Sequence, residues 1–208
     1  MDKKEKLEEI AREVKKCQRC RLFKTATNAV PGAGNQDTKI MFIGEGPGYH
    51  EDQQGLPFVG QAGKLLDQLL ESIKLKREEV FIGNVVKHRP PENRDPFPDE
   101  IEACSVWLDQ QIEVIDPSAI VTLGRFSMNK FLPGEFISRA HGQPRFVEDS
   151  DKKRIVMPMY HPAAALRNSL VMETLKNDFQ KIPGLLGEKK EVEEKKKKDD
   201  NGEQLELI

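Results

Sequence analysis

Residues 39–48 read KIMFIGEGPG, a short apolar run that stops at a glycine-rich loop. An apolar run of this length without polar alternation predicts a strand that is buried on both faces, as the strands of parallel sheets are. Similar runs occupy residues 80–86, 119–123 and 155–159. Pro158 lies inside the last of these and favours an edge strand there, because proline donates no hydrogen bond to a neighbouring strand.

Helical patterns lie between these runs. Apolar residues recur with helical spacing over 60–73, 98–115, 125–131 and 163–182, and a charged helical pattern covers 4–16. Strands that alternate with helices of this length predict the α/β class. We therefore expect residues 1–187 to form a three-layer α/β/α sandwich with a central, mostly parallel four-stranded sheet.

The composition points away from membranes and gives no global attraction to nucleic acid. The 208 residues are 37% hydrophobic and 33% charged, and no run approaches the roughly 20 apolar residues of a spanning helix. No apolar segment follows the charged N-terminus, so we expect a monomeric cytoplasmic protein without a secretory signal. All of the net charge of −2 lies in residues 188–208. Binding to DNA would therefore rest on local basic patches.

Polar residues follow each predicted strand at its carboxyl end. They are residues 44–52 after the first strand, Asn84 and 87–91 at the second, 124–125 after the third and 160–162 after the fourth. In an open parallel sheet, ligands bind beyond the carboxyl ends of the strands. We therefore expect these groups to converge on one rim.

The glycine-rich loop is not a dinucleotide fingerprint. Gly44, Gly46 and Gly48 give G-x-G-x-G, where the fingerprint needs G-x-G-x-x-G at the start of a helix. Pro47 also lacks the N–H that a phosphate would use. The loop is either a tight structural turn or a place where the main chain closely approaches a flat ligand.

Three side chains near the rim allow both a structural and a binding interpretation. Asn84 could hydrogen-bond a neighbouring loop, or present a donor and an acceptor side by side to a ligand. His161 could be a helix cap or core histidine, or it could contact a ligand. Phe58, between Pro57 and Gly60, could be core or a stacking platform.

The cysteines predict a metal site. Cys17 and Cys20 form a C-x-x-C, Cys104 lies far along the chain, and His88 is the candidate fourth ligand because there is no fourth Cys. A Cys₃His set suits zinc, and it suits an iron–sulfur cluster with one Cys replaced. The alternative without metal is a free C-x-x-C and a buried Cys104. A disulfide framework is not typical of a cytosolic chain.

Taken together and in order, these motifs resemble a family-4 uracil-DNA glycosylase, the iron–sulfur type of its superfamily. The matching segments are 44–48 with 51–52, 55–60 with 62–63, 84–87, 89–91 with 93–94, Cys104 and 161–163. The resemblance implies a base-excision-repair enzyme that flips uracil out of single- or double-stranded DNA. It would hydrolyse the N-glycosidic bond and leave an abasic site. It also implies a structural [4Fe–4S] cluster on Cys17, Cys20, His88 and Cys104, with zinc as the alternative.

The resemblance also implies how uracil is bound. Phe58 would stack on the flipped base, and Asn84 would read its Watson–Crick edge, which differs from that of cytosine. The main chain at Gly44, Glu45 and Gly46 would hold O2 or O4. These five residues form the expected uracil-binding site together with the histidine described next.

The expected catalytic residues are His161, Glu45 and Glu51. His161 would donate a hydrogen bond to O2 and stabilise the leaving uracil anion, a role that a neutral imidazole can fill. Either Glu45 or Glu51 would orient the attacking water, and Glu51 could instead exclude the thymine methyl group. Candidate phosphate contacts are Arg19, Arg21, Lys24, Arg125, Arg139, Arg145 and Arg167.

His88 is a departure from the family pattern, which usually has Cys there. A His in this position resembles the branch that traps uracil-DNA covalently, but that branch carries a basic insertion with a nucleophilic His. Here the chain runs directly into residues 89–91 without it, which favours hydrolysis. The alternatives are a non-hydrolytic uracil-DNA-binding protein, a covalently trapping protein, or a zinc-bearing nucleotide-binding protein of the same fold.

The C-terminal segment predicts a tether and a docking peptide. Residues 188–203 are almost entirely polar and charged, which is typical of a disordered tether. The last five, Gln204–Ile208, resemble the bacterial sliding-clamp binding peptide, with Ile where that peptide usually ends in Phe. An apolar tip on a polar tether would raise the effective concentration of the protein at DNA.

Overall fold

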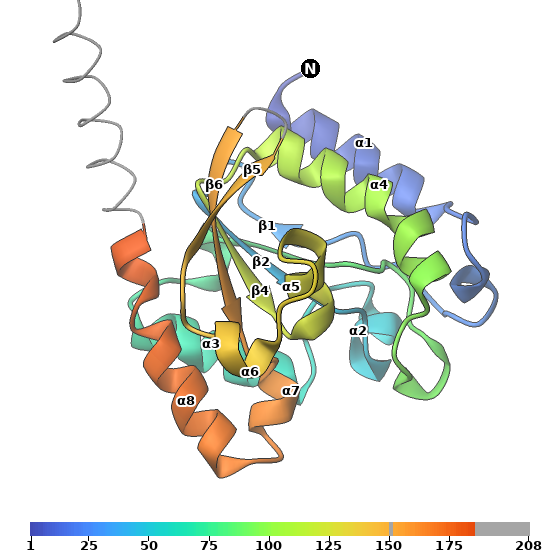
Figure 1. Ribbon diagram of the computed structural model, residues 1–208. Helices are drawn as coiled ribbons and strands as arrows, with labels where there is room; N and C mark the ends of the chain where they lie inside the picture. The colour runs from blue at the N-terminus through green and yellow to red at the C-terminus, as the bar shows by residue number, and fades with distance from the viewer. Residues whose placement is uncertain (150–151, 186–208) are drawn as a thin grey trace, which may run out of the picture.

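The computed structural model describes residues 1–149 and 152–185 (Figure 1). The predicted tether at 188–203 and the predicted clamp-binding peptide at 204–208 lie outside the described residues. Among the helices of these two ranges, none is long and apolar enough to cross a membrane.

A six-stranded sheet forms the centre of the described chain, in the order β1-β3-β2-β4-β6-β5. The strands are β1 (Ala33–Gly34), β2 (Ile40–Gly44), β3 (Phe81–Asn84), β4 (Ala119–Leu123), β5 (Arg145–Asp149) and β6 (Lys152–Met159). The four predicted strands are β2, β3, β4 and β6, which pair in parallel. The α/β class and the mostly parallel sheet are confirmed. The predicted number of strands is wrong, because β1 and β5 add short antiparallel edges.

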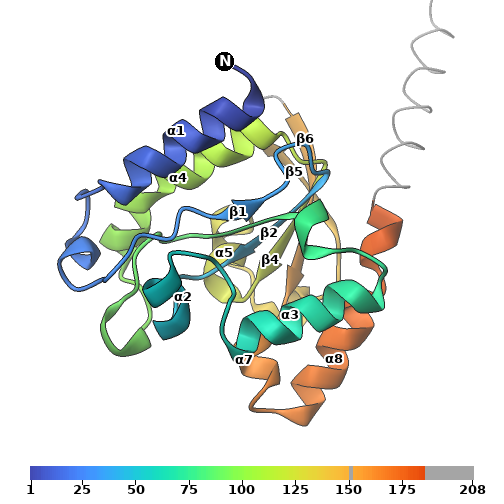
Figure 2. The ribbon, with the colours of Figure 1, turned by 180° about the vertical axis from the view of Figure 1, so that it is seen from behind.

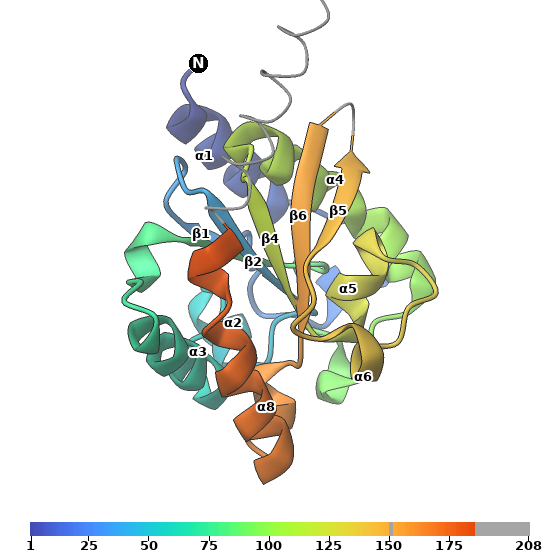
Figure 3. The same ribbon diagram turned by 60° about the vertical axis from the view of Figure 1, so that its left-hand side comes forward.

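Helices cover both faces of the sheet (Figure 3). Ile40 and Phe42 of β2 pack in a core with α3 and α8, whereas Met41 and Ile43 pack in a second core with α4. Because side chains alternate along a strand, a strand between two helical layers needs an unbroken apolar run. The helices are α1 (Lys3–Lys15), α2 (Tyr49–Gln54), α3 (Gln61–Ser72), α4 (Pro98–Ile115), α5 (Arg125–Phe131), α6 (Ile137–Ala140), α7 (Pro162–Ala165) and α8 (Ser169–Phe179), with 3₁₀ turns at Arg21–Lys24, Arg77–Glu79 and Pro91–Asn93.

The single helix predicted at 163–182 is two helices, α7 and α8. Asn168 separates them, and its side-chain oxygen accepts hydrogen bonds from the main-chain N–H groups of Leu170 and Val171. An Asn in this position caps a new helix because it satisfies N–H groups that have no partner within the helix. The break places α7 at the rim of the sheet and α8 along its face (Figure 2).

The prediction of an edge strand from Pro158 is wrong. Strand β6 lies between β4 and β5. Its pairing with β5 ends at Val156, opposite Arg145, so Pro158 lies beyond that ladder and its missing N–H leaves no gap. The Pro158 carbonyl instead accepts a hydrogen bond from Gly142 N–H at 2.8 Å.

Candidate active site

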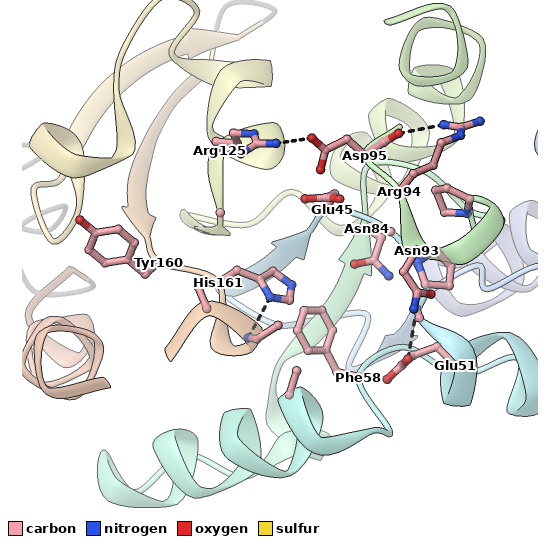
Figure 4. A pocket seen from close by; sticks show the side chains of 18 of the residues that line it. Glu45, Glu51, Phe58, Asn84, Asn93, Arg94, Asp95, Arg125, Tyr160 and His161 are labelled. Carbon is pink, nitrogen blue, oxygen red and sulfur yellow. Dashed lines mark hydrogen bonds and ion pairs between the residues drawn. The ribbon is translucent and has the colours of Figure 1, made fainter. Parts of the chain in front are cut away.

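One cavity lies at the carboxyl ends of the parallel strands, with a volume of about 520 Å³ (Figure 4). The expected convergence on one rim is confirmed. Each parallel strand brings residues to the wall: Glu45 follows β2, Asn84 ends β3, Arg125 follows β4 and His161 follows β6. The volume lies within the range of small-molecule sites.

Asn84 carries an unsatisfied amide into this cavity. The residue is 1% exposed, and its Oδ1 has no hydrogen-bond partner among the residues that the structure describes. Gly44 pairs with Asn84 in the β2–β3 register, and a Cβ on Gly44 would lie 2.5 Å from that oxygen. A buried amide oxygen without a partner costs free energy, which a ligand with a matching N–H would recover.

Phe58 forms the side of the cavity next to Asn84. Its backbone has a φ of 52°, in the left-handed region that few non-glycine residues adopt. The main chain of Gly63 lies against it, and a Cβ there would be 1.9 Å from the Phe58 carbonyl oxygen. The Phe58 and His161 rings have centroids 5.5 Å apart with planes inclined by 29°. Phe58 therefore belongs to the core and also faces the cavity.

His161 is both a helix cap and a cavity residue. It is the N-cap of α7, where its Nδ1 accepts a hydrogen bond from Ala163 N–H at 3.1 Å. Burial lowers the pKa of His161 to about 4, an effect that the charge of Glu51 only partly opposes. The imidazole is therefore neutral at neutral pH. Since Nδ1 is an acceptor, the proton of the neutral ring lies on Nε2.

Glu45 is a cavity carboxylate with a raised pKa. The pKa is about 7, because burial, the largest cause, and the charge of Asp95 raise it more than the charge of Arg125 lowers it. Arg125 and Asp95 form an ion pair with each other above Glu45 (Figure 4). A carboxylate with a pKa near neutrality suits general base catalysis.

Glu51 holds the loops of the cavity together. Its Oε1 accepts hydrogen bonds from the N–H groups of Val59 and Gly60, both at 2.8 Å, and its Oε2 accepts one from Gly48 at 3.2 Å. Both carboxylate oxygens therefore bind main-chain donors. The contacts fix the glycine-rich loop to the segment that carries Phe58.

The three cysteines lie in one corner of the structure. Cys17 and Cys20 follow α1, which packs against α4 (Figure 2), and Cys20 packs against a small buried cluster that contains Cys104 of α4. Burial raises the pKa of Cys104 to about 11, and the nearby Cys20 and Cys17 thiols add to this effect. Trp107 Nε1 donates to Cys17 Sγ at 3.2 Å. His88 is buried, and its electrostatic partner is Asp52. Within the described ranges no three His, Cys, Asp or Glu side chains are arranged as a metal-binding group.

The candidate phosphate contacts differ in how far they are already engaged. Arg21, Arg125 and Arg145 form ion pairs with acidic side chains, and Arg19 donates to a main-chain carbonyl. Arg167 lines the cavity, and its contact with a phosphate stays a prediction.

The fold and this cavity define a class. The family model described as the uracil DNA glycosylase superfamily matches residues 31–182, and this chain belongs to that superfamily. Its relatives include type-4 uracil-DNA glycosylases. The chain is 50% identical over 190 residues to the type-4 uracil-DNA glycosylase of Archaeoglobus fulgidus, covering 89% of this chain and 96% of that protein. It is 50% identical over 183 residues to the type-4 enzyme of Sulfurisphaera tokodaii (85% and 83%) and 45% identical over 168 residues to that of Thermotoga maritima (80% and 86%).

Proposed function

We propose that this chain removes uracil from DNA by hydrolysing its N-glycosidic bond, the activity named in its type-4 relatives. The observation that carries the proposal is the unpartnered Asn84 Oδ1 beside Phe58 and His161. Uracil offers N3–H to this oxygen and O4 to the Asn84 amide nitrogen. Cytosine has an acceptor at N3 and a donor at N4, so both contacts fail. Mispaired buried groups of this kind can discriminate by ~10⁴.

Flipping brings uracil into the cavity at a cost that is smallest for mispaired or single-stranded bases. Phe58 stacks on the ring, which is worth ~1–3 kcal/mol. The main-chain N–H groups of Glu45 and Gly46 bind the base from the strand side. His161 Nε2–H donates to O2, where negative charge develops as the bond breaks, and one good donor of this kind is worth ~3 kcal/mol.

Glu45 is the group that activates the water. Glu51 has both oxygens on main-chain N–H groups, so its role is to hold the loops. Glu45 makes no such contact in the described structure and has a pKa of about 7. In its ionised form it can accept a proton from water as the sugar becomes cationic.

The test uses an end-labelled oligonucleotide with one uracil, split after reaction between hot alkali and a denaturing protein gel. Hydrolysis predicts alkali-sensitive cleavage without a slow-migrating adduct, and Asn84→Ala and His161→Ala should each slow it by about 10²-fold or more. Asn84→Ala should melt near the wild type, because Oδ1 has no partner among the residues that the structure describes. Unchanged cleavage in both variants would overturn the proposal, and an adduct would identify a covalently trapping protein. Tight uracil-DNA binding without cleavage would select the non-hydrolytic alternative.

A [4Fe–4S] cluster on Cys17, Cys20, Cys104 and His88 completes the proposal. Three soft thiols in one corner have the donor chemistry that iron–sulfur clusters and zinc share. His88 follows Lys87, whose N–H donates to Cys104 Sγ at 3.2 Å, so its imidazole is the candidate fourth ligand. When bound, the group would crosslink the end of α1, the segment after β3 and α4.

Quantifying iron, sulfide and zinc in the purified protein tests the cluster. We expect iron and sulfide in equal amounts and no zinc; zinc without iron would overturn it. His88→Ala should lose metal and His88→Cys should keep it, with His50→Ala, an exposed histidine, as the matched control.

The clamp-binding peptide remains a proposal about Gln204–Ile208. Deleting these five residues should abolish capture by a bacterial sliding clamp while leaving uracil release from a free oligonucleotide unchanged. Equal capture of the full-length and truncated chains would contradict it.

A further inference from the structure

Lys87 is a fully buried lysine directly behind the uracil-reading residue. It is 0% exposed. Its Nζ donates to the Asn84 main-chain carbonyl at 3.0 Å and to Gln111 Oε1 at 2.7 Å. Gln111 is itself 1% exposed, and its Nε2 donates to the Pro31 carbonyl at 2.7 Å. A lysine is almost never buried this completely unless it is paired, and here its ammonium group donates to two neutral oxygens.

No hydrogen bond to Oδ1 from the described residues fixes the orientation of the Asn84 side chain. Its Oδ1 has no partner in the described structure, so the direction of the amide depends on how firmly its main chain is held. On one side the β2–β3 ladder holds it, with Gly44 opposite, and Val85 N–H donates to the Gly44 carbonyl at 3.1 Å. On the other side, Lys87 is the one side-chain donor to the carbonyl of Asn84 within residues 1–149 and 152–185.

The main chain of Lys87 is fixed as well. Its N–H donates to Cys104 Sγ at 3.2 Å, and its carbonyl accepts from Val30 N–H at 2.7 Å. One residue therefore connects the cysteine corner, the Gln111 side of α4 and the end of β3. A side chain that contacts the substrate must be held close to its productive position, and rigid neighbours behind it provide this support.

We propose that Lys87 is a positioning residue for uracil recognition, which acts by holding the Asn84 carbonyl so that the amide meets the base in register. The inference rests on the proposed function. It predicts that Lys87 matters only as long as Asn84 has an amide to position.

The experiment is a double-mutant cycle with Lys87→Met and Asn84→Ala, measured as single-turnover uracil release. Asn84→Ala keeps the main-chain carbonyl, so the Lys87 contact survives in that variant. Lys87→Met removes the hydrogen bonds to the Asn84 carbonyl and to Gln111. We expect it to slow release about 10-fold in the wild-type background, because the Asn84 carbonyl loses its donor in a buried network, and to have little effect in the Asn84→Ala background. Lys39→Met, an exposed lysine before β2, should change neither rate.

An equal loss in both backgrounds would overturn the inference, and so would no loss in either. If the wild type releases no uracil, the proposed function itself fails, which is a different result. Should Lys87→Met not fold, Lys87→Met/Gln111→Met removes both buried polar partners together, a change that is often tolerated. Gln111→Met alone keeps the contact between Lys87 and the Asn84 carbonyl, so it should slow uracil release less than Lys87→Met does. If Gln111→Met slows release as much as Lys87→Met or more, Lys87 does not act through the Asn84 carbonyl.

Discussion

The rate of uracil release should fall as pH drops below neutrality, because Glu45 must be ionised to accept a proton. With a pKa of about 7, Glu45 is ~90% ionised at pH 8 and ~3% ionised at pH 5.5, so the rate should fall ~30-fold between them. His161 contributes nothing in this window, because its pKa of about 4 keeps it neutral throughout.

Two substitutions should move the midpoint of this profile in opposite directions. Asp95→Asn removes a charge that raises the pKa of Glu45 and frees Arg125, so the midpoint should move to lower pH. Arg125→Gln removes the opposing charge and should move it to higher pH. Burial is the largest cause of the raised pKa, so the midpoint in Asp95→Asn should stay above 4.5, the ordinary value for the side chain.

The assay is single-turnover cleavage with enzyme in excess, from pH 5.5 to 8. Unfolding caused by the titration of Glu45 cannot produce the same fall in rate at low pH. A carboxyl group whose folded pKa is raised contributes stability that is present at low pH and is lost as pH rises through the folded pKa. A flat wild-type profile, or shifts of the same sign in the two variants, would refute Glu45 as the base. Glu45→Gln should remove the acid limb altogether.

Gly44→Ala should lower activity by at least ~10²-fold, because its Cβ would lie 2.5 Å from Asn84 Oδ1 and 2.7 Å from the Phe58 ring and would displace both from the proposed binding site. Gly184→Ala, with nothing within 4 Å, is the control; equal activities would contradict the assigned binding site. Trp107 is the single tryptophan of the chain and donates to Cys17 Sγ. Stripping bound metal with a chelator should therefore change its fluorescence, and an unchanged emission spectrum would argue against a metal on Cys17.

The parallel strands and the rim could be predicted from the sequence because burial on both faces imposes a local pattern. Strand β2 has to be apolar at every position, and the chain shows this in five consecutive residues. The rim follows from parallel pairing alone, since all carboxyl ends then lie at one edge. The edge strands escaped prediction for the converse reason. Strand β1 is two residues long, and β5 is an edge strand without an unbroken apolar run.

The different roles proposed for the carboxylates of Glu45 and Glu51 could not be predicted from the sequence. Glu45 and Glu51 are six positions apart in the segment after the first predicted strand, and nothing in the local sequence distinguishes their roles. Glu51 is committed to Val59 and Gly60 only because the chain folds back on itself. Its role therefore depends on contacts between segments, which a single sequence does not encode in any pattern.

The buried position of Lys87 could not be predicted from the sequence either, because a lysine that follows a strand is normally exposed. Its partner Gln111 is 24 residues away on α4, and only the closed structure shows that both lie inside.

The contrast between Asn84 and Glu51 gives a physical criterion for which cavity residues bind substrate. Folding tends to satisfy every buried polar atom that it can, so an unsatisfied atom of a residue in the cavity wall, such as Asn84 Oδ1, marks a place where a ligand can supply the partner. Both carboxylate oxygens of Glu51 accept hydrogen bonds from main-chain N–H groups, so this residue shapes the cavity. Asn84 Oδ1 has no partner among the residues that the structure describes, and Lys87 holds the Asn84 carbonyl, so a base edge with a matching N–H would supply the missing hydrogen bond. On this argument, specificity for uracil resides as much in the anchoring of the Asn84 carbonyl as in the amide that touches the base.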